Sequence, residues 1–199
     1  ALPLRRDGGR WIPGRAAVLA AGGAMRFPTV TPLPGGWLVL WAEEEGKGGA
    51  LRGVWLDAGG GLAGKPFRVA AVPHPYVFMA TAPGGRGKAW VAFSSTWPED
   101  PAKDLDVTLA LVVRTGSGAR VVSVPAGPVS RLVMFVPPPM ATIGDGTPAQ
   151  VMVREAVSWR RTAVLAPAPG GGCLLLGLHR DRLTARLAGS GITDGMTTV

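Results

Sequence analysis

The sequence predicts an all-β fold, a propeller-like array of about three to four antiparallel four-stranded sheets. The first observation is composition: 30 Gly and 19 Pro punctuate short apolar runs in a 199-residue chain that is 47% hydrophobic. Such usage is typical of turns between strands, and the apolar content is ample for a core. Second, almost no stretch competes as a helix. Third, one sheet module recurs along the chain.

The module is clearest in residues 35–70. Residues 36–41 carry apolar side chains at both alternating sets of positions, which predicts an inner strand covered on two faces. Residues 51–56 form the return strand, after a loop through residues 43–49 that we expect to be longer than a two-residue turn. Residues 66–70 then predict an edge strand, where the leading Pro66 is tolerated because its missing donor is not needed.

Weaker copies of the module predict the domain organisation. Met79-Ala80-Thr81 matches Met140-Ala141-Thr142, and the flanking positions Thr29 and Thr198 extend a spacing of 50 to 61 residues. This period suits four-stranded propeller blades. We therefore expect N-terminal strands that complete a blade in residues 1–24. Blade-like modules follow in residues 25–72, 73–130 and 131–199, the last including the start of a further blade.

A resemblance supports this organisation over about 36 residues. GWLVLW at 36–41, LRGVWLDAGG at 51–60 and LAGKPFRVA at 62–70 resemble the repeat of secreted bacterial β-propellers, which reads G-x-(W/F)-L-V-x-W, G-x-R-(L/V)-D-x-x-G and L-G-x-P-F-x-(V/I). The resemblance fades in the later modules. It implies a propeller-like sheet array of an extracellular protein with no assigned chemistry. The S-x-D-x-G-x-x-W motif of sialidases is absent from the sequence.

The predicted array is incomplete, because three modules fall short of the four to eight blades that close a propeller. We expect a second protein chain, or another copy of this one, to complete the ring. The chain starts at Ala1, which is consistent with a removed signal peptide and predicts a periplasmic, cell-surface or extracellular location.

Charge and cysteine content narrow the classes of partner. The net charge is +8, but the basic residues stand singly or in pairs without interleaved aromatic side chains, so we expect no nucleic-acid partner. No apolar run reaches the roughly 18 residues of a membrane span. The single cysteine, Cys173, excludes an internal disulfide framework and is expected to be a small buried hydrophobe.

The sequence predicts no catalytic residue, no metal and no cofactor. His74 and His179 have no ligand partners at metal-binding spacing, and no serine lies in a G-x-S-x-G turn. Asp104 and Asp106 lie in a polar loop that has the alternating acids of a calcium loop without its glycine and terminal glutamate. Together with His74 and Trp97, these two aspartates are the candidate contacts for a ligand or partner.

Tryptophan is over-represented, with seven residues against a single tyrosine. Alternation along strands predicts a core position for Trp37, Trp41, Trp55 and Trp90, whereas Trp97 lies at a loop mouth where an indole can stack on a sugar ring.

The sequence therefore favours a non-catalytic structural or protein-interaction subunit of an exported bacterial assembly. One alternative is a carbohydrate-binding module. The other is a sialidase-like or lyase-type propeller enzyme, which requires acids and arginines to converge at one end of the array.

Overall fold

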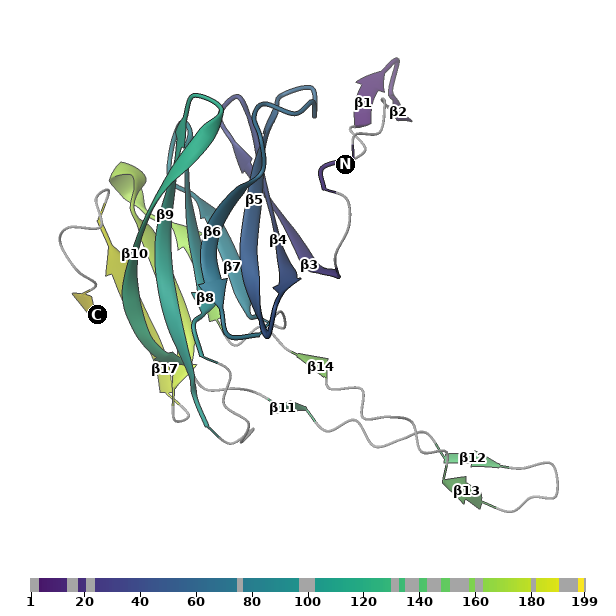
Figure 1. The fold of residues 1–199 in the computed structure, drawn as a ribbon, viewed down its shortest axis with the longest axis vertical. Coiled ribbons are helices and arrows are strands. Elements are labelled where there is room, and N and C mark those ends of the chain that lie inside the picture. The colour runs from purple at the N-terminus through teal and green to yellow at the C-terminus, as the bar shows by residue number, and fades with distance from the viewer. Residues whose placement is uncertain are drawn as a thin grey trace.

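The computed structural model describes residues 4–13, 18–20, 24–74, 77–96, 103–129, 133–134, 140–142, 148–150, 158–159, 163–179, 182–189 and 197–198. Within these ranges the fold is all-β, without an α-helix, and one 3-10 turn spans Pro169–Gly171. Most strands belong to three four-stranded antiparallel sheets (Figure 1). No helix in this part of the chain is long and apolar enough to cross a membrane.

Sheet 1 is formed by the module that the sequence shows most clearly. Its strands follow one another in chain order, so that each pairs with the next: β3 (Met25–Leu33), β4 (Gly36–Glu45), β5 (Gly48–Asp57) and β6 (Phe67–Val72). The strand β4 is an inner strand and β6 is an edge strand. The bulge between Leu51 and Arg52 shifts the register at that edge.

The β4–β5 hairpin corrects one expectation. Residues 43–45 lie inside β4, and only Gly46 and Lys47 separate Glu45 from its pairing partner Gly48. The turn is therefore of the two-residue kind, and Gly46 permits it by adopting a φ of +61°. The glutamates extend the strand because Arg52 Nε lies 2.8 Å from Glu43 Oε2, and Arg68 Nη2 lies 2.8 Å from Glu45 Oε2.

Sheets 2 and 3 repeat the same four-stranded meander. Sheet 2 consists of β7 (Met79–Pro83), β8 (Lys88–Ser94), β9 (Leu105–Thr115) and β10 (Gly118–Val129). Sheet 3 consists of β15 (Ala163–Pro167), β16 (Cys173–His179), β17 (Arg182–Ala188) and β18 (Thr197–Thr198).

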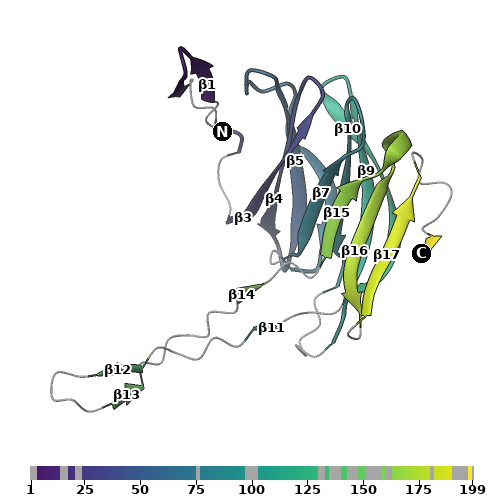
Figure 2. The same ribbon diagram turned by 180° about the vertical axis from the view of Figure 1, so that it is seen from behind.

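The three sheets stack face to face in chain order, with sheet 2 in the middle (Figure 2). The first strands of the sheets are neighbours, since β7 contacts both β3 and β15. One core fills the space between sheets 1 and 2, with Leu38, Leu40, Trp55, Val91, Phe93 and Val112. The other fills the space between sheets 2 and 3, with Trp90, Leu109, Leu111, Leu165, Cys173 and Leu175.

An arginine crosses the second of these interfaces. Arg186 of β17 donates hydrogen bonds to the carbonyl oxygens of Ala126 and Pro128 in β10, where a bulge shifts the register between Pro125 and Gly127. Burial lowers the pKa of this guanidinium, which stays charged because an arginine side chain is not deprotonated in proteins. The bulge thus presents carbonyls that tie sheet 2 to sheet 3.

The third sheet does not begin where the repeat predicts. Met140–Thr142 is β12, which pairs with β13 (Pro148–Gln150) in a sheet of two strands, and sheet 3 starts only at Ala163. Thr198 belongs to β18, the fourth strand of sheet 3, and does not start a further sheet. The three-residue match coincides with a strand at both places, but it does not specify the sheet to which the strand belongs; the longer apolar runs of β15 and β16 form the start of sheet 3.

The remaining strands also form pairs. β1 (Leu4–Asp7) pairs with β2 (Arg10–Pro13), and β11 (Val133–Met134) pairs with β14 (Ser158–Trp159). Both pairs, like β12 and β13, lie outside the stack of sheets in Figures 1 and 2.

Candidate functional site

The four candidate contact residues do not form one described site. Trp97 lies outside the residues that the structure describes, and His74 is half-buried two residues after the end of β6. Asp104 precedes β9 and Asp106 is its second residue, with an exposed side chain. Across the described ranges no three His, Cys, Asp or Glu side chains gather as a metal site would require.

The backbone of Asp106 has a structural role. Its carbonyl oxygen accepts hydrogen bonds from the Ser95 backbone N at 2.8 Å and from Ser95 Oγ at 3.2 Å, and its N–H donates to Thr96 Oγ1 at 2.9 Å. These bonds hold Ser95 and Thr96, which follow β8, against the start of β9. Asp106 therefore acts structurally through its main chain.

Cys173 is unsuited to nucleophilic chemistry. Its side chain is buried between sheets 2 and 3, and this burial raises the pKa of the thiol to about 12. The thiolate is the reactive form, so the neutral thiol is inert at physiological pH. The residue acts as a small core hydrophobe, as expected from its apolar strand.

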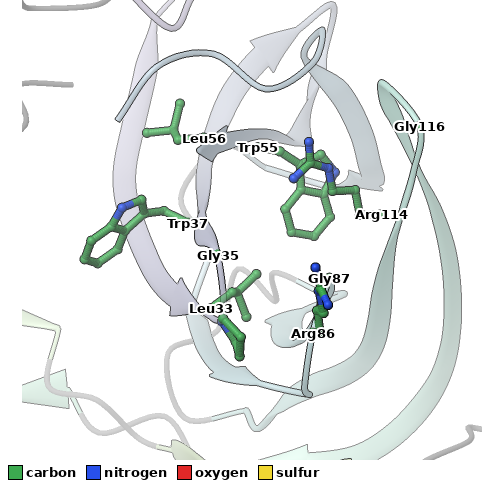
Figure 3. Close-up of a pocket in the computed structure, with 11 residues that line it drawn as sticks. Leu33, Gly35, Trp37, Trp55, Leu56, Arg86, Gly87, Arg114 and Gly116 are labelled. Carbon is green, nitrogen blue, oxygen red and sulfur yellow. The ribbon is translucent and has the colours of Figure 1, made fainter. Parts of the chain in front are cut away.

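A cavity of about 440 Å³ lies at the turn end of sheets 1 and 2 (Figure 3). Its lining comes from the turns β3–β4, β7–β8 and β9–β10 together with the end of β5. Trp55 is buried there, and its Nε1 donates a 3.0 Å hydrogen bond to the carbonyl oxygen of Gly118. The indole of Trp37 points away from the arginines on the other side of the cavity.

The charged side chains that line this cavity are all positive. Arg86 and Arg114 line it, and no carboxylate is among the described residues of the lining. Arg114 Nη2 also donates to the carbonyl oxygen of Ala63 at 3.1 Å. Two guanidinium groups can attract an anion, but without a carboxylate or imidazole the lining offers no general acid or base. Sequence reasoning missed this cavity because its residues come from separate turns.

The outer face of sheet 3, which is the face turned away from sheet 2, is an exposed apolar surface. Directly paired residues of an antiparallel sheet share a face, so Leu174 and Leu176 lie on it with Leu187 and Val164, while Leu175 points into the core. Val164 is 49% exposed, Leu187 43% and Leu183 72%. Single exposed apolar residues are ordinary, but a whole face of them indicates an interaction surface.

The corresponding faces of sheets 1 and 2 are covered. In the second strand of each sheet, the side chains that point toward the following sheet are Leu38 and Leu40 of β4 and Trp90 and Ala92 of β8. All four are fully buried, because the next sheet packs on them. Their counterparts in β16 are Leu174 and Leu176, which are only partly buried. The repeated pattern therefore continues to a face on which no sheet packs among the described residues.

The opposite end of the stack, the outer face of sheet 1, is covered differently. Its central side chains Val39, Trp41 and Val54 are buried, and Leu19 and Ala20 from the N-terminal segment pack against them. This face corrects one expected core position, since Trp37 is 39% exposed at its margin. The alternation of apolar residues could not predict this exposure, because the residues that cover the centre of the face do not extend to Trp37.

Comparisons of the chain with protein-family models, with curated proteins and with solved structures found no match.

Proposed function

We propose that this chain is a non-catalytic structural and protein-interaction subunit of an exported bacterial assembly, and that it joins the assembly through the outer face of sheet 3. The observation that carries this proposal is the exposure of Val164, Leu183 and Leu187 on one continuous aliphatic face. Each buried leucine of this kind stabilises an association by roughly 1.5–3 kcal/mol. Leaving the face in water forfeits that stabilisation.

The arrangement of the sheets supports a propeller-like array. Three four-stranded meanders stack in chain order, and the first strand of each lies beside the first strand of the next. Blades of a propeller are arranged in this way around an axis. In the proposed assembly, a sheet from another chain packs on the outer face of sheet 3.

The proposed location outside the cytoplasm rests on the resemblance of residues 36–70 to the repeat of secreted bacterial propellers. Osmotic-shock fractionation of the cells that natively produce the chain tests it. We expect the chain in the released or extracellular fraction, and retention with a cytoplasmic marker would contradict this part of the proposal.

The native mass of the complex tests the interaction role. We expect the chain, extracted gently from its source, to run in a complex larger than its own 20.5 kDa. The Leu183→Glu variant should run outside that complex, because it places a charge on the proposed contact face. A wild-type chain that runs at 20.5 kDa in the extract would overturn the proposal.

A further inference from the structure

We infer that the sheet that covers sheet 3 is sheet 3 of a second copy of this chain, related to the first by a two-fold axis. The inference rests on the proposed function and names its partner. It follows from three features: the chemistry of the face, its relief, and the covered state of the other end of the stack.

The chemistry of the face is self-compatible. On β15, β16 and β17, every side chain that the structure describes on this face is aliphatic, and the set is Val164, Ala166, Leu174, Leu176, Leu183, Ala185 and Leu187. A two-fold contact places the same patch on both partners, so a charge on the patch would meet its own sign or be buried unpaired. This face carries no charge among those residues and avoids that cost.

The sizes of the side chains on the face permit close packing. Along β17, Ala185 lies between Leu183 and Leu187, and on β15 the small Ala166 follows Val164. Large and small side chains thus alternate on one surface. When two such sheets pack face to face, leucines of one copy can enter the spaces above alanines of the other, as the inner faces of β-sandwiches interdigitate.

The other end of the stack argues against a head-to-tail ring or filament of copies. Such an assembly requires sheet 3 of one copy to pack on the outer face of sheet 1 of the next. The centre of that outer face is already buried under Leu19 and Ala20. Val30 and Trp37 are exposed on that face, but Val30 lies on the edge strand β3 and Trp37 at the start of β4. The face of sheet 3 has an uncovered centre, so a closed pair in which the two sheet 3 faces cover each other is favoured.

The size of the face sets the strength of the pair. Four strands about 4.8 Å apart and at most seven residues long, at about 3.3 Å per residue, present roughly 300 Å² of flat area. A standard interface buries about 800 Å² per partner. We therefore expect a dimer that dissociates on dilution, in the micromolar range.

Sedimentation equilibrium of the purified full chain over about 1–200 μM tests the inference. We expect the mass to rise with concentration from 20.5 kDa toward twice that value. Leu183→Glu should stay at 20.5 kDa at every concentration, with an unchanged circular dichroism spectrum. Leu183→Ala, which preserves the fold of an exposed site, should raise the dissociation constant roughly tenfold or more.

The matched control is Val30→Glu on β3, because Val30 is 55% exposed on the outer face of sheet 1. This variant should dimerise like the wild type. If Val30→Glu alone abolished the dimer, or if Leu183→Ala dimerised as tightly as the wild type, the contact of two sheets 3 would be wrong.

The failure of this inference can be distinguished from the failure of the proposed function. A wild-type chain that stays at 20.5 kDa up to 200 μM overturns the second copy as the partner. If its native complex is nevertheless larger and sensitive to Leu183→Glu, the interaction role of the face stands with a different chain as the partner.

Discussion

Trp90 provides the sharpest test of how the sheets are held together. Its indole is completely buried between sheets 2 and 3, and its Nε1 donates a 2.9 Å hydrogen bond to the carbonyl oxygen of Gly171 in the 3-10 turn of sheet 3. Trp55 makes the equivalent bond from sheet 1 to Gly118 of sheet 2. Each tryptophan therefore contributes apolar packing and one hydrogen bond to the following sheet.

The two contributions can be separated by substitution. Trp90→Phe keeps most of the buried ring but removes the donor, which should lower the free energy of unfolding by about 1–2 kcal/mol. Trp90→Ala also leaves a large cavity and should lower it by about 3–5 kcal/mol. Urea titrations followed by far-ultraviolet circular dichroism measure both values, with equal slopes expected for the variants and the wild type.

Trp37→Phe is the matched control, because that indole is 39% exposed at the margin of sheet 1; its cost should stay within about 0.5 kcal/mol. A loss below about 1 kcal/mol for Trp90→Ala would refute the packing of sheet 2 on sheet 3. Equal losses for Trp90→Phe and Trp90→Ala would refute the partition between packing and hydrogen bond.

Three further predictions concern single residues. Arg186→Met removes both hydrogen bonds to the bulge of β10 and should cost about 2 kcal/mol in urea unfolding, and an unchanged midpoint would speak against that tie. The Cys173 thiol, with its pKa raised to about 12, binds its proton more tightly in the folded chain than in the unfolded chain. Stability should therefore fall by about 1.4 kcal/mol per pH unit from pH 9 toward 12, relative to Cys173→Ala, and parallel pH profiles of the two proteins would contradict this. Trp97→Ala should abolish any glycan-array signal while the fold is kept, if the carbohydrate-binding alternative holds, and a wild-type array without signal would count against that alternative.

The local sequence pattern was sufficient to predict the strands of sheet 1. The apolar runs at 36–41 and 51–56 are long and bounded by glycines, so they locate two inner strands, and Pro66 marks the edge that follows. The ends of the hairpin were not predictable in this way, because the three glutamates at 43–45 are typical of a solvated loop. In the fold they pair with residues 48–50 of β5 and form ion pairs with Arg52 and Arg68. Side-chain partners across strands do not show in a local pattern.

The candidate site depends on tertiary arrangement. The alternation of residues 173–177 predicts a strand with two apolar faces, but only the stacking order of the sheets decides which face is open. The cavity with Arg86 and Arg114 likewise forms where turns that are distant in the chain meet. The repeat of Met79 at Met140 misplaced the third sheet, because three shared residues carry no pairing information.

Oxidative footprinting of Leu183 tests the central claim most directly, because it reads the exposure of the sheet 3 face inside the functional assembly. Leu183 is 72% exposed and Val30 is 55% exposed in the isolated chain, so both should be labelled when the purified protein is dilute. In the native assembly we predict that labelling of Leu183 falls several-fold while labelling of Val30 is unchanged. Equal labelling of Leu183 in the assembly and in the dilute chain would contradict the account, since it would show that nothing covers this face.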